Sequence, residues 1–234
     1  MLELAPPTVI VATFSGSKGG TGKTTLAVSL SLAASLRVET LLVDASAEGG
    51  ATAYLLGDCP GPYLSEDPDG SLRLVDAGGV QLTVAVNRGP LLRPEKVASS
   101  VEEWSERYQL VVIDQPALTD VDAVERYMPL LRLADTILIV TEPNPASIEA
   151  SLYRFGGKRV VVALNSPRPY PRTVVEHYRR VVEHFCRKHG YEYVLVPYEP
   201  AVSRLGPDAL RVFDYTSSDY DSAIAKLVNF LLRQ

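Results

Sequence analysis

Short uninterrupted apolar runs alternate along the chain with longer stretches in which apolar residues recur every three or four positions. Continuous runs of Val, Ile and Leu are typical of strands buried on both faces, and the longer stretches are typical of helices that bury one side. The pattern predicts strands at 8–14, 40–44, 72–75, 82–86, 109–114, 136–141, 159–164 and 193–196. It predicts helices at 24–36, 94–107, 122–133, 146–155, 173–188 and 218–232.

This alternation predicts an α/β fold. Helices that connect parallel strands cover both faces of a sheet, so we expect a doubly wound, mostly parallel sheet with helices on both faces. The turn-forming sequence Asp76-Ala77-Gly78-Gly79 separates two of the strands and predicts a hairpin or paired edge strands. Residues 57–70 are expected to form a surface loop. We expect a single domain, residues 1–234, that binds ligands at the carboxyl ends of its strands.

Composition narrows the class of protein. Hydrophobic residues make up 46% of the 234 residues, which excludes intrinsic disorder. The sequence contains no uninterrupted run of about 18 apolar residues, so no membrane-spanning helix is predicted. The net charge of −5 argues against a wholly basic nucleic-acid-binding protein but leaves room for a local basic patch. Cys59 and Cys186 form no Cys-x-x-Cys pair, so they are expected to be buried free thiols in a cytoplasmic protein.

The segment Ser15-Gly16-Ser17-Lys18-Gly19-Gly20-Thr21-Gly22-Lys23-Thr24-Thr25 follows a predicted strand and opens a predicted helix. Glycines let successive backbone N–H groups turn toward phosphate oxygens, and the helix N-terminus adds partial positive charge. We therefore expect Lys23 to bridge terminal phosphates and the Thr24 hydroxyl to bind Mg²⁺. The expected nucleotide-binding residues of the loop are Lys18, Gly19, Gly20, Thr21, Gly22, Lys23, Thr24 and Thr25.

Two departures from a generic phosphate loop point to a family. Ser17 replaces the first glycine, and Lys18 lies inside the loop. The Lys-Gly-Gly-x-Gly-Lys-Thr-Thr pattern resembles the deviant Walker A loop of the ParA/MinD family of ATPases, and the resemblance extends over nearly the whole chain. It implies binding of ATP and ADP with Mg²⁺. It also implies an ATP-sandwich homodimer in which Lys18 reaches the partner's nucleotide, so that Lys18 and Lys23 act together on the charge of phosphoryl transfer.

Acidic residues complete the expected magnesium and catalytic site. Asp114 follows four apolar residues, as a Walker B carboxylate does, and is expected to hold Mg²⁺ with Thr24; capping of the next turn is the alternative. Asp44 matches the first acid of the family's switch I segment. Ser46 replaces the second acid, which positions the attacking water in the family, and serine is a poor base. Asp44 is the remaining catalytic acid of this segment, and we expect slow hydrolysis. Asp44 or Glu48 could compensate for the acid that Ser46 replaces.

The expected base-binding residues follow two late strands. Asn165 ends one of them, and in the family an asparagine at this position contacts the adenine. The Asn-Lys-x-Asp signature for guanine is absent, so ATP is expected over GTP. Pro197, Tyr198 and Glu199 resemble the family's segment that lines the base pocket, with a plain strand-to-helix turn as the alternative.

The densest basic cluster lies on the predicted helix 173–188. ParA-type proteins bind DNA non-specifically through surface Arg and Lys, which gives a salt-dependent affinity, so the DNA-binding candidates are Arg179, Arg180, Arg187 and Lys188. Glu176 and Glu183 dilute this face, and a solvated helix is the alternative. The amphipathic C-terminal helix carries few basic residues and is expected to pack against the sheet rather than anchor in a membrane.

These features predict a molecular switch of the ParA type. It dimerises around ATP, binds non-specific DNA and a ParB-like adaptor, associates with the nucleoid, and acts in chromosome or plasmid partitioning. One alternative is a MinD-like positioning ATPase on a membrane surface. Another is an ATP-dependent scaffold that hardly hydrolyses ATP, because switch I lacks its second acid.

Overall fold

The computed structural model describes residues 8–17, 19–77 and 79–233. Within these residues, eight strands form one sheet in the order β3-β4-β2-β5-β1-β6-β7-β8. The strands are β1 (Val9–Phe14), β2 (Thr40–Asp44), β3 (Leu72–Ala77), β4 (Val80–Ala85), β5 (Leu110–Asp114), β6 (Thr136–Thr141), β7 (Arg159–Asn165) and β8 (Glu192–Val196). Neighbouring strands are parallel except β3 and β4, which form the antiparallel hairpin expected from the sequence.

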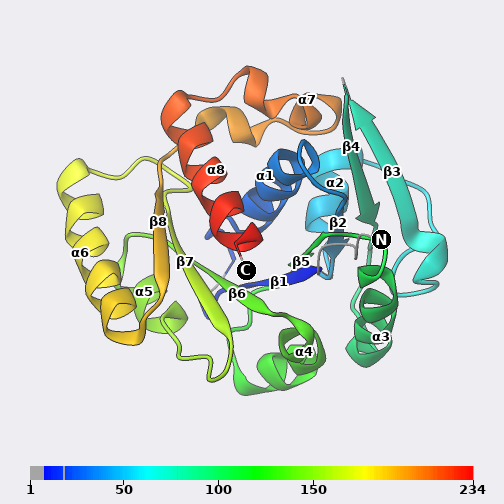
Figure 1. Cartoon of the computed structure of the whole chain (residues 1–234), viewed down its shortest axis with the longest axis horizontal. Helices are drawn as coiled ribbons and strands as arrows, with labels where there is room; N and C mark the ends of the chain where they lie inside the picture. Colours follow the sequence, from blue (N-terminus) through cyan, green and yellow to red (C-terminus); the bar gives the residue numbers. More distant parts are fainter. Residues whose placement is uncertain (1–7, 18, 78, 234) are drawn as a thin grey trace, which may run out of the picture.

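Helices cover both faces of this sheet, which confirms the predicted fold class (Figure 1). The helices are α1 (Lys23–Ser35), α2 (Gly50–Leu56), α3 (Pro94–Ser105), α4 (Val121–Leu133), α5 (Pro145–Ser151), α6 (Arg172–His189), α7 (Pro207–Leu210) and α8 (Ser218–Leu232). One core cluster contains buried residues of α1, α2, α7 and α8, and a second contains buried residues of α3, α4, α5 and α6. In Figure 1, α1, α7 and α8 lie above the strands, and α3 and α4 lie below.

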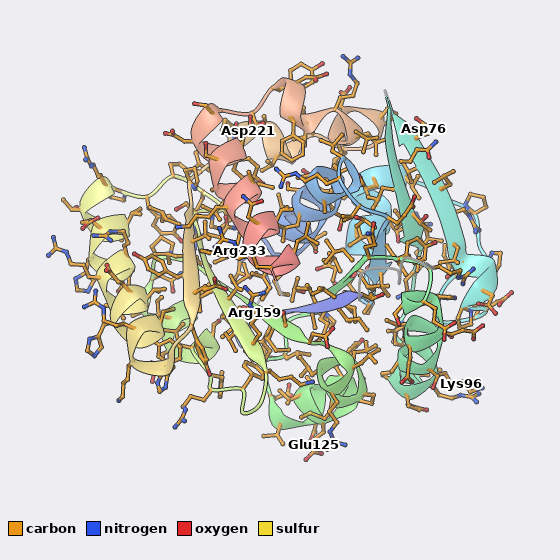
Figure 2. All side chains as sticks on the ribbon, in the orientation of Figure 1. Asp76, Lys96, Glu125, Arg159, Asp221 and Arg233 are labelled. Atoms are coloured by element: carbon orange, nitrogen blue, oxygen red, sulfur yellow. The ribbon has the colours of Figure 1, made fainter. Side chains whose placement is uncertain are left out.

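The central strands supply both cores, which explains their unbroken apolar sequence. In β1, Val9 and Val11 belong to one cluster, whereas Ile10, Ala12 and Phe14 belong to the other. Successive strand residues point to opposite faces, so a strand covered on both sides needs an apolar residue at every position. Figure 2 shows the side chains that fill the space between layers, while labelled Lys96 and Glu125 lie at the outer surface.

One expectation about local structure is wrong, and several short helical elements were not predicted. The predicted helix 146–155 ends at Ser151, and Tyr153 and Phe155 instead pack edge-on against Phe14 at centroid distances of 5.7 and 5.0 Å. Helix α2 was not predicted, because its seven residues begin after Gly49 with no side-chain cap. Short helical turns lie within 200–214, for which the sequence pattern predicted no element.

The C-terminal helix packs as its pattern indicates. Its buried residues are Tyr220, Ala223, Ile224, Leu227, Val228 and Leu231, and they join the core that α1 shares. Across residues 8–17, 19–77 and 79–233, no helix combines the length and apolarity needed to cross a membrane. Both cysteines are buried free thiols, as expected.

The sheet order brings the polar strand ends together. Strand β1 lies between β5 and β6, so the chain moves to one side of β1 for β2 and β5 and to the other side for β6, β7 and β8. Ligands of open α/β sheets bind at such a point, beyond the carboxyl ends of the strands. Asp44 and Asp114 are register partners at the ends of β2 and β5, beside the loop that leaves β1.

Candidate functional site

The glycine-rich loop connects β1 to α1 at the carboxyl edge of the sheet. Gly20 and Gly22 adopt φ values of 98° and 86°, which L residues with side chains rarely adopt. Gly22 caps α1, and its carbonyl accepts the first helical hydrogen bond from Leu26 at 2.9 Å. A Cβ on Gly16 would lie 1.9 Å from the carbonyl oxygen of Ala150, so the loop also packs closely on α5.

Asn165 holds the loop from the end of β7. Its Nδ2 donates a hydrogen bond of 2.8 Å to the carbonyl oxygen of Thr21. A Cβ on Gly22 would lie 2.3 Å from the same Nδ2 atom. The side chain that the family resemblance assigns to adenine therefore contacts the phosphate loop itself in this structure.

Lys23 and Asp114 are buried charged residues of the site, and each affects the pKa of the other. Burial lowers the pKa of Lys23, and the carboxylates of Asp114 and Glu48 raise it in part. Burial, with the nearby charge of Asp44, raises the pKa of Asp114 to about 7, while the Thr24 hydroxyl and Lys23 oppose that rise. Asp114, although distant in the sequence, thus lies beside the consecutive residues Lys23 and Thr24 at the start of α1.

The donor set fits Mg²⁺ bound with a nucleotide. Neither carboxylate oxygen of fully buried Asp114 has a hydrogen-bond partner among the described residues, and the same holds for the buried Thr21 hydroxyl. The described part of the chain contains no group of three or more His, Cys, Asp or Glu able to hold a metal ion. Mg²⁺ commonly takes one or two protein ligands and completes its shell with phosphate oxygens and water, which one carboxylate and one hydroxyl satisfy.

Asp44 is occupied by hydrogen bonds from its own chain segment. Its Oδ1 accepts from the Ser46 N–H at 3.1 Å and the Ser46 hydroxyl at 2.7 Å. Its Oδ2 accepts from the Thr52 N–H and the Thr52 hydroxyl, both at 2.7 Å. Burial raises the pKa of Asp44, and these four bonds oppose the rise. The carboxylate therefore fixes the turn between β2 and α2.

Ser46 lies beside the magnesium candidates. Its Oγ accepts a 2.7 Å hydrogen bond from the Gly50 N–H at the start of α2. A Cβ on Gly50 would lie 3.1 Å from Thr24 Oγ1 and 3.3 Å from Ser46 Oγ. Residues 41–52, which resemble switch I and are called the switch-like segment below, thus approach Thr24 closely. Glu48 of this segment is exposed.

The segment after β8 is mainly structural in this state. Glu199 is buried, and its two carboxylate oxygens accept from the Ala201 N–H at 3.0 Å and the Ser217 N–H at 2.8 Å. It thereby caps the following turn and joins it to the start of α8. Tyr198 is 43% exposed and Pro197 is half-buried, so both are open to contact with a ligand.

Several buried polar residues escaped the sequence analysis. Hydroxyl groups link the loop to α5 through Ser15, Ser17, Ser147 and Ser151, with contacts of 3.1 to 3.4 Å. Asn87 directly follows the strand predicted at 82–86, two positions beyond the end of β4 at Ala85, and donates a hydrogen bond to the switch-like segment. A polar residue directly after a buried strand was the available signal, the same one that identified Asp114. The hydroxyl chain had no comparable signal, because its members are far apart in sequence.

The remaining candidates lie away from this group. On α6, Arg179 is paired with Glu176 and Glu183, Arg180 with Glu176, and Arg187 with Glu183, at 2.8 to 3.3 Å. Hydrogen bonds from Arg179 lower the pKa of Glu176 to about 2, so its charge persists at neutral pH. Lys188 is exposed near the C-terminal end of α6. Lys18 lies outside the described residues.

Known proteins share this architecture. No family model matches the chain. It is 28% identical over 159 residues to an uncharacterized ATP-binding protein of Methanocaldococcus jannaschii, and this match covers 59% of the chain and 56% of that relative's length. MinD of Pyrococcus horikoshii OT3, complexed with Mg-ADP, superposes with a TM-score of 0.73 over 96% of both chains at 19% identity. The chain has the fold of the MinD/ParA ATPases.

Other MinD/ParA structures agree with this assignment of the fold. A ParA-family ATPase of Chlorobium tepidum superposes with a TM-score of 0.69 at 19% identity, covering 97% of this chain and 98% of the other. The pNOB8 ParA bound to nonspecific DNA superposes with a TM-score of 0.65 at 16% identity, over 97% and 98% of the two chains.

Proposed function

We propose that the chain is a single P-loop ATPase domain that binds ATP with Mg²⁺, hydrolyses it slowly and acts as a nucleotide-dependent switch. The observation that carries this proposal is the convergence of Lys23, Thr24 and Asp114 beside a glycine loop of suitable backbone shape. The buried Asp114 carboxylate has no hydrogen-bond partner among the described residues. Burial of such a charged group destabilises the folded state unless a cation binds to it.

Each residue has a distinct role in this proposal. The backbone N–H groups of the loop and the N-terminus of α1 hold the phosphates, and Lys23 stabilises charge on the terminal phosphate oxygens. Thr24 and Asp114 hold Mg²⁺, which neutralises phosphate charge when it is bound. Lys18 acts on the nucleotide of a second copy. Asn165, Pro197, Tyr198 and Glu199 surround the base, with Asn165 and Glu199 acting through the backbone they hold.

Slow hydrolysis follows from the switch-like segment. Asp44 has both oxygens engaged, Ser46 cannot remove a proton effectively and Glu48 is exposed, so no carboxylate of this turn is both buried and free to orient the attacking water. Asp44 is then a positioning residue that keeps Ser46 and Thr52 in place.

Ser46→Asp tests this explanation. A carboxylate at position 46 adds a base near Thr24, and we expect steady-state phosphate release to rise about tenfold or more. Ser46→Asn is the matched control, because it has similar size and no charge. Rapid turnover by the wild type, with no gain in S46D, would contradict the proposed cause of slow hydrolysis.

We further propose that ATP drives dimerisation and that the dimer binds DNA non-specifically, with a ParB-like adaptor as a second partner, in chromosome or plasmid partitioning. A ParA with the same fold has been solved on nonspecific DNA, which supports this choice. The Arg side chains of α6 are the candidate contacts. The carboxylates of Glu176 and Glu183 reduce the net charge of this face, so binding at moderate affinity that weakens as salt rises is expected.

Binding to random-sequence duplex DNA, followed by fluorescence anisotropy in ATP and in ADP over a salt series, tests the DNA role. We expect binding only with ATP, weakening as salt rises. The double variant R180E/R187E should lose at least about tenfold in affinity and show a shallower salt slope. Lys96→Glu makes a similar charge change per site on α3 and should have little effect. Equal or absent binding with both nucleotides would reject the DNA role.

A MinD-like role on a membrane surface is the second candidate, because MinD structures share the fold. The apolar residues of α8 are buried against α1, which leaves that helix little apolar surface for lipid. Vesicle co-sedimentation that depends on ATP and on residues 220–233 would favour this candidate over the DNA role.

A further inference from the structure

The loop after β4 is hydrogen-bonded to the switch-like segment. Asn87 is fully buried, and its backbone N–H donates a 2.9 Å hydrogen bond to the Thr52 hydroxyl, which itself donates to Asp44. The Gly89 N–H donates to the carbonyl oxygen of Ala47 at 2.8 Å. A Cβ on Gly49 would lie 2.4 Å from the Asn87 carbonyl oxygen, so the two backbones are in close contact.

The side-chain amide of Asn87 joins two separate segments. Its Nδ2 donates to the carbonyl oxygen of Ser46 at 2.8 Å and to that of Gly89 at 3.1 Å. Its Oδ1 accepts from the Ser65 N–H at 3.2 Å. Two carbonyl acceptors on one side and one N–H donor on the other assign the orientation of the amide group without ambiguity.

The second segment is the surface excursion 57–71, which leaves α2 and returns to β3. Ser65 belongs to it, and its hydroxyl also donates to the Arg88 carbonyl oxygen at 3.2 Å. Arg88 makes an exposed ion pair with Asp58 at 2.8 Å. Asn87 is therefore the buried connection between this excursion and the turn that carries Ser46.

We propose that Asn87 is a positioning residue for ATP turnover: its amide holds the Ser46 turn against Thr24 and couples that turn to the excursion 57–71. A primary amide is needed because one end must donate and the other must accept. Removal of a buried bonded group leaves its partners unsatisfied, which loosens the turn without touching the phosphate loop. Only the consequence for turnover rests on the proposed function; the coupling itself does not.

Amide hydrogen exchange can test separately the two hydrogen bonds of the Asn87 amide, from Nδ2 to Ser46 and from Ser65 to Oδ1. Asn87→Ala removes both, and the amides of Gly50, Thr52 and Ser65 should all exchange about tenfold faster or more. Asn87→Asp keeps an acceptor for the Ser65 N–H but loses the donor to Ser46, so Gly50 and Thr52 should lose protection while Ser65 keeps it. Arg88→Ala removes the exposed ion pair with Asp58 and the side-chain contacts to Gly57 and Tyr63 but leaves the Asn87 amide in place, so it is the control and should leave all three unchanged. If the buried charge of N87D prevents folding, N87A still decides the question.

Turnover supplies the second readout. In N87A we expect kcat for ATP to fall about tenfold with KM within twofold of the wild type, because the nucleotide-binding loop is intact. Unchanged protection at Gly50 and Thr52, or a uniform loss that includes the amides of β6, would overturn the proposal, since the latter indicates general destabilisation. A wild type that binds no ATP rejects the proposed function while leaving the exchange result to decide the coupling.

Discussion

Asp114→Asn should stabilise the nucleotide-free protein and abolish its response to Mg²⁺ with ATP. The carboxylate is fully buried, lies near Asp44 and has no hydrogen-bond partner among the described residues, so its charged form is destabilised. Asparagine has nearly the same shape without the charge. At pH 8 we expect D114N to unfold with a free energy about 1–4 kcal/mol higher than the wild type, from a pKa raised from 3.8 to about 7.

The raised pKa of Asp114 makes the free energy of unfolding depend on pH. Between pH 4 and 7 the native protein keeps a proton on Asp114 that the unfolded chain has lost, so this group makes the free energy of unfolding fall as pH rises. The difference between D114N and the wild type should be large at pH 8 and close to zero at pH 4. Burial raises the pKa of Asp44 as well, which adds to the trend in both proteins.

Urea unfolding from pH 4 to 8, with and without Mg²⁺ and ATP, measures both effects. Ligand should stabilise the wild type above pH 7, where Asp114 is charged, and should not stabilise D114N. Glu125→Gln removes an exposed carboxylate on α4 and serves as the control for charge alone. A D114N protein that is less stable than the wild type at pH 8, or one stabilised equally by the ligand, would show that Asp114 is not an unpaired metal ligand.

Gly22→Ala should remove nucleotide binding while leaving the fold in place. A side chain here meets two obstacles, a φ of 86° and a Cβ position 2.3 Å from Asn165 Nδ2. The loop must therefore change conformation or push Asn165 away from Thr21. We expect ATP affinity to fall about a hundredfold or more and the free energy of unfolding to fall by about 1–3 kcal/mol.

Calorimetric titration with ATP and Mg²⁺ measures this loss. Gly156→Ala is the matched control, because its added Cβ would meet nothing within 4 Å and should leave affinity unchanged. The double variant G22A/N165A relieves the steric conflict but not the φ conflict, so it should recover only part of the lost affinity. Wild-type affinity in G22A would mean that the loop does not hold phosphate in this shape.

The sequence predicted the features that local patterns determine. Continuous apolar strands, the hairpin at Gly79, and the glycine loop between a strand and a helix each depend on neighbouring residues, and the structure places them as expected. The proximity of Asp44 and Asp114 followed from parallel strands ending at one edge. The i, i+4 spacing of Glu and Arg on α6 likewise anticipated a diluted basic face.

Contacts between distant segments cannot be predicted from local sequence patterns. Nothing near Ser46 indicates that Asn87, 41 positions away, would bind its carbonyl oxygen. The saturation of Asp44 depends on Thr52 at the start of a helix whose formation relies on packing rather than on a cap. The sequence places Asn165 at the end of its strand. Its hydrogen bond to Thr21, 144 positions away in the sequence, depends on the path of the phosphate loop.

The proposed function depends on the binding of ATP with Mg²⁺ at Lys23 and Asp114. The most direct test is a calorimetric titration of the wild type and of Lys23→Ala with ATP in the presence of Mg²⁺. Our account predicts one ATP per chain for the wild type, weaker binding when Mg²⁺ is replaced by chelator, and a loss of at least about a hundredfold in affinity for K23A. Absence of binding by the folded wild type, or equal affinity in K23A, would contradict it.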